Sequence, residues 1–81
     1  MTEKKLRLFN KLFNELWKYF KEHSDPDDSD EFWASLRNEG AALNDSFREL
    51  DDPDLKDVAE QLIVTTIHCI QNIYRRKEGR M

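Results

Sequence analysis

The segment HSDPDDSDEFW, residues 23–33, separates two stretches of helical periodicity and decides how the chain is divided. Pro26 cannot continue a helix that precedes it, because its ring removes a hydrogen-bond donor and restricts the residue before it. Beyond the proline, Asp28 has Glu31 three positions later, which is the pattern of a capping box, and Ser29 is an equally suitable N-cap. The segment therefore predicts one helix that ends at about residue 22 and another that begins at about residue 29.

The stretch before this segment predicts an amphipathic helix over residues 3–22. Its apolar residues recur at helical spacing and fill about half of the circumference, and basic residues occupy the opposite side. The apolar positions are Leu6, Phe9, Leu12, Phe13, Leu16, Trp17 and Phe20. This helix needs at least one partner helix to cover its apolar side.

The stretch after the segment predicts a second helix over residues 29–49 with a narrower apolar stripe. Gly40 falls within that stripe, and its missing side chain allows another helix to approach closely. Asp52 and Pro53 then announce a third helix over 53–77, because aspartate is a good N-cap and proline suits the first helical position. Residues 78–81 are predicted to be a flexible basic tail.

Together these patterns predict an all-α fold, namely a single-domain, up-down-up three-helix bundle over residues 1–81 with short acidic connections. The chain has 81 residues with only two glycines and two prolines, which disfavours a β-sandwich with its frequent turns. No apolar run is long enough to cross a bilayer, and Cys69 is the only cysteine. We therefore expect a cytoplasmic protein in a reducing compartment, with no membrane association.

The residue pattern argues against catalysis and against a metal or cofactor site. The acidic segment places Asp25, Asp27 and Ser29 like the first ligands of an EF-hand loop, but Asp30 replaces the required glycine and Leu36 replaces the final glutamate. His68 and Cys69 are helix neighbours that point about 100° apart, so they cannot form a nucleophile–base pair. The prediction is a protein that is not an enzyme and binds no metal or cofactor.

Charge is segregated along the chain. Residues 1–23 carry a net charge of +3, residues 24–60 of −10 and residues 61–81 of +3. One interpretation is internal compensation in the bundle: Arg75–Lys77 lie near the first acidic connection, and Lys4, Lys5 and Arg7 lie near the second. The other is an acidic face for a basic, nucleic-acid-binding protein partner, with affinity that falls as salt rises. The residues of that acidic face are Glu39, Asp45, Glu49, Asp57 and Glu60.

The apolar residues of the predicted third helix exceed what two neighbouring helices need to cover. Val64 lies outside the main stripe and, with Ile67 and Tyr74, extends the apolar surface towards an edge that Trp17 matches on the first helix. These residues either pack within a broad core or form the interface of a homodimer or of a complex with a protein partner, where aromatic side chains serve as anchors.

Two further binding modes are disfavoured by the residues that would carry them. The exposed start of the helix over 53–77 would enter a DNA groove with Asp54, Asp57 and Glu60 against a single lysine, so phosphates would repel it. Only the basic end of that helix could contact nucleic acid directly. The amphipathic helix over 3–22 has the form of a membrane-surface helix, but the fold needs its apolar side as core.

The chain resembles small helical proteins of phages and mobile elements of Gram-positive bacteria. The resemblance rests on LWKYF before the acidic segment, DDSDEFWASL within and after it, and the helix end IYRRK. It implies an accessory protein that inhibits or adapts a host or phage component. We expect a non-enzymatic binding module that presents the acidic face as an inhibitor. The alternatives are a homo-oligomer assembling through the helix over 53–77, and a nucleic-acid accessory protein that uses its basic ends.

Overall fold

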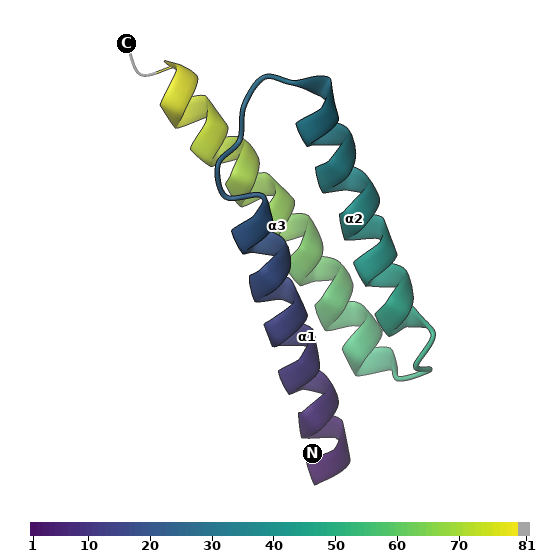
Figure 1. Ribbon diagram of the computed structural model, residues 1–81. Coiled ribbons are helices and arrows are strands. Elements are labelled where there is room, and N and C mark those ends of the chain that lie inside the picture. Colours follow the sequence, from purple (N-terminus) through teal and green to yellow (C-terminus); the bar gives the residue numbers. More distant parts are fainter. Residues whose placement is uncertain (80–81) are drawn as a thin grey trace.

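Three α-helices make up most of the chain: α1 (Glu3–Glu22), α2 (Asp30–Arg48) and α3 (Pro53–Gly79). They are seen in a computed structural model that describes residues 1–79 (Figure 1). α2 runs antiparallel to both other helices, so α1 and α3 are parallel to each other. The extents of the Cα trace, 49 × 20 × 17 Å, give a bundle about one helix in length. The predicted all-α three-helix bundle is confirmed.

Helix α1 begins and ends through local hydrogen bonds that its sequence provides. The Thr2 hydroxyl accepts a hydrogen bond from the Lys5 amide at 3.1 Å, which is the N-cap contact. At the other end the amide of His23 donates to the carbonyl oxygens of Phe20 and Lys21. Its imidazole is buried, so the residue that ends α1 is also part of the interior.

Ser29, and not Asp28, caps the start of α2. The Ser29 hydroxyl accepts from the Phe32 amide at 3.1 Å. The Asp27 carboxylate accepts from the Ser29 amide at 2.8 Å, and hydrogen bonds from Ser29 hold the pKa of Asp27 below its usual range. The predicted capping box of Asp28 and Glu31 is therefore wrong, and the alternative prediction of Ser29 as the N-cap is confirmed. Asp27 holds the serine in the capping position.

The connection between α1 and α2 is held by packing as well as by caps. Pro26 is fully buried, and its carbonyl oxygen accepts a hydrogen bond from Lys77 Nζ at 3.1 Å. The indole Nε1 of Trp33 donates to the Asp27 carbonyl oxygen at 2.9 Å. Lys77 also pairs with Asp25 at 3.3 Å. Of the basic residues Arg75–Lys77, the lysine makes the predicted contact with this acidic connection.

Helix α3 begins at Asp52-Pro53 as its sequence indicates. The Asp52 carboxylate accepts from the amides of Asp54 at 3.0 Å and Leu55 at 3.1 Å. The hydrogen bond from the Leu55 amide, with the charge of Lys5, holds the pKa of Asp52 below its usual range. Lys5 Nζ lies 2.7 Å from Asp54 and 3.5 Å from Asp52, so α1 is tied to the start of α3.

The end of α3 differs from the prediction. The helix continues through Glu78 and Gly79, so the flexible tail predicted to begin at residue 78 is wrong for these two residues. Arg80 and Met81 lie outside the described residues. In the part of the chain that the structure describes, no helix has the length and apolar character that a membrane span requires.

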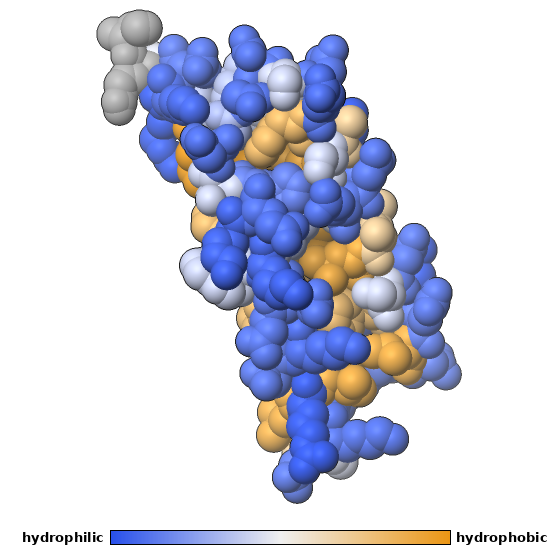
Figure 2. Space-filling model, in the orientation of Figure 1, coloured by the Kyte–Doolittle hydropathy of each residue, from blue (hydrophilic) through white to orange (hydrophobic). Residues whose placement is uncertain are grey.

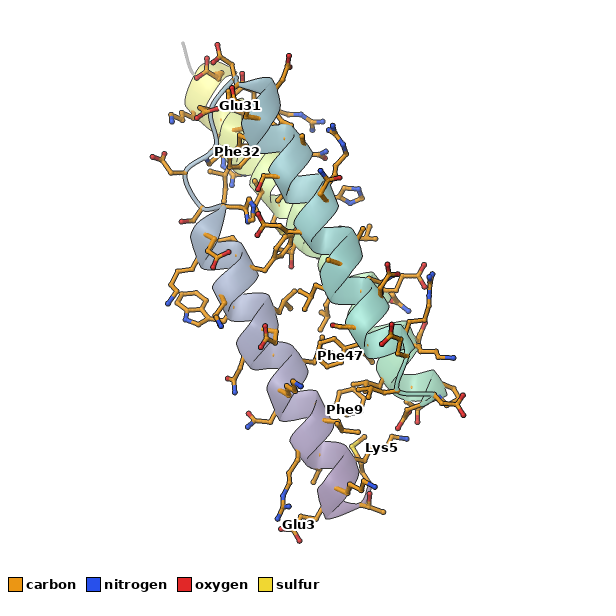
Figure 3. The ribbon with its side chains drawn as sticks, turned by 45° about the vertical axis from the view of Figure 1, so that its right-hand side comes forward. Glu3, Lys5, Phe9, Glu31, Phe32 and Phe47 are labelled. Carbon is orange, nitrogen blue, oxygen red and sulfur yellow. The ribbon has the colours of Figure 1, made fainter. Side chains whose placement is uncertain are left out.

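The core consists of two clusters stacked along the bundle. The lower cluster contains Leu12, Phe47, Leu55 and Ala59, with Phe9 packed against it. Figure 3 shows Phe9 and Phe47 close together, from α1 and α2. The upper cluster is built on Tyr19, Leu36 and Ile70, with Phe32 packed against it. Burying these side chains stabilises the fold by roughly 25 cal/mol per Å² of apolar surface.

Candidate functional site

An apolar groove runs between α1 and α3 on the surface of the bundle. Its volume is about 310 Å³. The lining residues are Phe13, Leu16, Trp17 and Phe20 from α1, and Leu62, Thr65, Thr66 and Cys69 from α3. We call this surface the α1–α3 groove. Phe13 is 51% exposed and Trp17 is 57% exposed, so two aromatic side chains stand at its edge.

These aromatic side chains are exposed because α1 is apolar over a wider arc than two neighbours cover. Leu12 is fully buried against both other helices. Phe13 follows it by about 100° around the helix, and Trp17 lies one turn above Phe13, about 40° further from the core. Leu6, two turns below Phe13, is also more than half exposed. The arc therefore leaves three large apolar side chains of α1 outside the bundle.

The walls of the groove are apolar even where their residues carry polar atoms. The Thr66 hydroxyl donates to the Leu62 carbonyl oxygen of its own helix at 2.7 Å, so its donor is already used. The rings of Trp17 and Phe20 are stacked with centroids 6.2 Å apart. Lys21 Nζ lies 5.6 Å from the centre of the Trp17 ring, which places a cation at the upper rim.

The other surfaces of the bundle are more polar than this groove. Figure 2 shows mostly hydrophilic side chains over the outer sides of the helices, although some apolar surface is also visible between α1 and α2. The groove between α1 and α2 is lined mainly by charged residues, including Glu15, Lys18 and Glu39. The groove between α2 and α3 is lined by Ile63, Val64 and Ile67 but also by the polar residues Arg37, Asn44 and Glu60. An apolar ligand is therefore best accommodated between α1 and α3.

The apolar residues singled out in the sequence are divided among three places. Trp17 lines the α1–α3 groove. Val64 and Ile67 line the groove between α2 and α3 instead. Tyr74 packs edge-on against Trp33 with ring centroids 5.3 Å apart. The structure therefore brings Val64 and Ile67 together but does not join them to Trp17 or Tyr74 in one patch.

The five acidic residues of the predicted acidic face are also spread out. Glu39 lines the groove between α1 and α2, and Glu60 lines the groove between α2 and α3, so these two lie on different sides of α2. Asp45 pairs with Arg48 at 3.3 Å, and Asp57 accepts a hydrogen bond from the side chain of Gln61 at 2.9 Å.

The remaining member, Glu49, is exposed and caps the C-terminal end of α2. Asp45, Glu49 and Asp57 all lie towards the α2–α3 connection. Asp51 in that connection is 98% exposed at its side chain. Three of the five predicted acidic residues thus contribute to an acidic end of the bundle, while Glu39 and Glu60 lie elsewhere.

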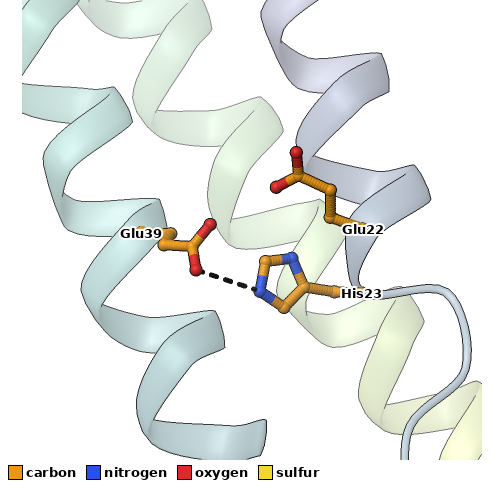
Figure 4. A group of neighbouring side chains, drawn as sticks. All are labelled: Glu22, His23 and Glu39. Carbon is orange, nitrogen blue, oxygen red and sulfur yellow. Dashed lines mark ion pairs between the residues drawn. The ribbon is translucent and has the colours of Figure 1, made fainter.

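Glu22, His23 and Glu39 form a cluster that sequence spacing did not reveal (Figure 4). Their potential ligand atoms all lie within 4.8 Å of one another, and these residue types bind zinc in other proteins. No local motif signals the group, because Glu39 follows His23 by sixteen residues and meets it only through the packing of α2 against the end of α1.

The contacts of His23 explain this cluster as a junction between α1 and α2. Nδ1 lies 2.8 Å from the Tyr19 carbonyl oxygen, which can only accept, so Nδ1 carries a proton and donates. Nε2 lies 3.3 Å from the Ser35 hydroxyl and 3.9 Å from the Glu39 carboxylate. The Ser35 hydroxyl in turn donates to Glu39 at 2.6 Å. Nδ1 is thus hydrogen-bonded to the protein, and Nε2 faces Ser35 and Glu39 across the junction.

Comparison of the chain with protein-family models, curated proteins and solved structures finds no match.

Proposed function

We propose that the protein is a small, non-enzymatic binding module whose contact surface is the α1–α3 groove. The observation that carries this proposal is the pair of aromatic side chains, Phe13 and Trp17, that are more than half exposed beside an apolar groove. Large aromatic residues next to a pocket are the residue types that supply most of the energy at protein interfaces. Keeping them in water opposes solubility, which a binding role explains and a purely structural role does not.

The proposal places the module in the cytoplasm as an accessory protein of a phage or mobile element. Its single cysteine, Cys69, is free and exposed, which suits a reducing compartment. The resemblance of its capping and core segments to small phage proteins supports the same setting. Partner binding through an apolar groove fits such a role because it requires no catalytic group.

Site-specific photo-crosslinking tests this function. A benzophenone amino acid is introduced at position 17 in the α1–α3 groove. A matched control carries it at position 64, in the groove between α2 and α3, where Val64 is 46% exposed. Irradiation of the protein in bacterial cells is expected to give a protein adduct from position 17 and none from position 64. Equal adducts from both positions, or none from either, would show that the groove is not a binding surface.

A second candidate function is inhibition of a basic, nucleic-acid-binding protein by the acidic end of the bundle. The exposed carboxylates of Asp45, Glu49 and Asp57 beside the α2–α3 connection support it. Such binding is electrostatic, so it should displace DNA from a basic DNA-binding protein at low salt and fail as ionic strength rises. Displacement that is independent of salt, or lost in Phe13→Glu and retained in Asp57→Lys, would contradict it.

A further inference from the structure

We infer that the α1–α3 groove binds a second copy of this chain, packed face to face and antiparallel about a two-fold axis that crosses the middle of the groove. This inference rests on the function proposed above and names the partner of the same site. It follows from three features of the described residues: the size of the face, the distribution of charge along α3, and the neutral polar residues between the charged ends.

The face that carries the groove is large enough for a stable dimer. The bundle is 49 Å long and 17 to 20 Å across, measured on Cα atoms. One long side therefore offers on the order of 800 Å² per subunit, which is what each partner contributes to an interface of standard size. The exposed side chains of Phe13 and Trp17 supply an apolar centre on this side.

Opposite charges lie at equal distances from the middle of the groove. Thr65 lines the groove near its centre. Asp54 precedes it by eleven residues and Arg76 follows it by eleven residues. Because eleven residues are close to three helical turns, the three side chains lie along nearly one line on α3, with each charge about 16 Å from Thr65. Both charged side chains are exposed.

A two-fold axis at the level of Thr65 exchanges these two positions. The axis lies in the interface at right angles to the helices, so α1 faces α1 of the other copy and α3 faces α3 in the opposite direction. Arg76 of each copy then meets Asp54 of the other, and the two Trp17 side chains meet near the axis. A two-fold axis parallel to the helices would instead hold Arg76 at the level of its own counterpart, at the opposite end of the bundle from Asp54 of the other copy, so the two charges could not pair.

Between the charged ends, the groove side of α3 carries no acidic residue, lysine or arginine. The sequence from Gln61 to Asn72 contains no acidic or lysine or arginine side chain, and it includes Thr65, His68 and Cys69. On α1 the rim residues Asn10 and Asn14 are exposed and uncharged. On α3 the two copies can therefore approach over the middle of the face without burying an unpaired charge, whereas on α1 the exposed Lys21 ammonium beside Trp17 must stay at the solvent edge of the interface.

Analytical ultracentrifugation over a range of protein concentrations tests the inference. The wild-type protein is expected to sediment as a dimer. Trp17→Glu and Phe13→Glu are expected to weaken dimerisation by roughly 1000-fold, because each change removes two anchors from the symmetric interface. The matched control Val64→Glu changes a similarly exposed position in the groove between α2 and α3, and it should leave the dimer unchanged. Circular dichroism melting confirms that each variant is folded.

A charge exchange tests the antiparallel orientation. Arg76→Asp alone places like charges opposite one another and should weaken the dimer. The double variant Arg76→Asp with Asp54→Arg restores opposite charges across the interface and should recover most of the wild-type dissociation constant. Lys5 also contacts Asp54, so melting of the double variant is measured in parallel. Failure of the exchange to recover affinity in a folded protein would overturn the antiparallel arrangement.

The outcomes separate this inference from the proposed function. A wild-type protein that stays monomeric at all concentrations overturns the dimer. If position 17 then crosslinks to a different protein, the groove is still a binding surface and only the identity of the occupant is wrong. A dimer that persists in Trp17→Glu and is lost in Val64→Glu overturns both, because association then runs through the groove between α2 and α3.

Discussion

The phenol of Tyr19 occupies the space that a side chain at position 40 would need. A Cβ atom built on Gly40 would lie 2.6 Å from Tyr19 Oη and 3.4 Å from a methyl group of Ile63. The same hydroxyl donates a hydrogen bond to the Leu36 carbonyl oxygen at 2.6 Å. The glycine in α2 thus allows a tyrosine from α1 to reach the backbone of α2, which fixes the separation of these two helices.

Gly40→Ala should destabilise the protein, although alanine is the better helix former. The gain in helix propensity is about 1 kcal/mol, and overpacking of a buried site costs typically 1–3 kcal/mol, so we expect a net loss of about 1 kcal/mol. Urea denaturation measures it. Combining the change with Tyr19→Phe removes the closest atom and should reduce the loss, whereas an increase in stability of the single variant would mean that the contact relaxes without cost.

Stability should fall at alkaline pH because of Tyr19. Burial, together with the nearby charge of Glu39, raises the pKa of Tyr19 to about 12. In the unfolded chain the pKa is about 10, so the folded state holds its proton more tightly. The contribution of the neutral Tyr19 phenol to the free energy of unfolding is fully present below about pH 10 and is lost as the pH rises towards 12.

Ultraviolet absorbance of the ionised phenol against pH, and urea denaturation at several alkaline pH values, measure this effect. The absorbance should show one tyrosine that ionises near pH 12. Burial also raises the pKa of Tyr74, which ionises above its ordinary value. Tyr19→Phe serves as the control, since it should remove the steepest part of the decline. An unchanged decline in that variant would assign it to other groups, such as the lysines.

The two candidate caps of α2 should differ in their effect on stability. Ser29→Ala removes the acceptor for the Phe32 amide and should lower the free energy of unfolding by about 1 kcal/mol. Asp28→Ala is the matched control, since the structure gives Asp28 no capping contact, and it should change stability by less than about 0.5 kcal/mol. Thermal melting compares them, and a larger effect at position 28 would return the cap to Asp28.

Periodicity and turn chemistry predict most of this fold because both act locally. Asp52 and Pro53 set the start of α3 through hydrogen bonds within three residues, so the sequence alone indicates them. The choice between Asp28 and Ser29 depends on Asp27 and on the indole of Trp33, which hold the connection from outside the capping motif. Because Asp28 and Ser29 are both suitable N-caps, these surrounding contacts determine which of the two caps α2.

The candidate site was predictable only in part. The apolar excess of the helix over 53–77, with Trp17 at the matching edge of the first helix, predicts exposed apolar residues on the bundle surface. The sequence does not show which apolar residues remain uncovered, because that depends on how each helix is rotated against its neighbours. Phe13 follows the helical pattern of the core, yet it lies outside because α3 covers the side of α1 that carries Leu12.

Neighbouring residues of α1 should therefore separate folding from binding. Leu12 is fully buried. Leu12→Ala should therefore lower the free energy of unfolding by about 2–5 kcal/mol, because apolar contacts are lost and a cavity is left behind. Phe13→Gln removes a side chain that is half exposed and should cost less than about 1 kcal/mol. Association, measured by ultracentrifugation, should respond in the opposite order: Phe13→Gln should weaken it strongly at full helical content, while Leu12→Ala should leave it intact at temperatures where the protein is folded. If Phe13→Gln lowered the free energy of unfolding as much as Leu12→Ala, Phe13 would be a core residue and not part of a binding surface.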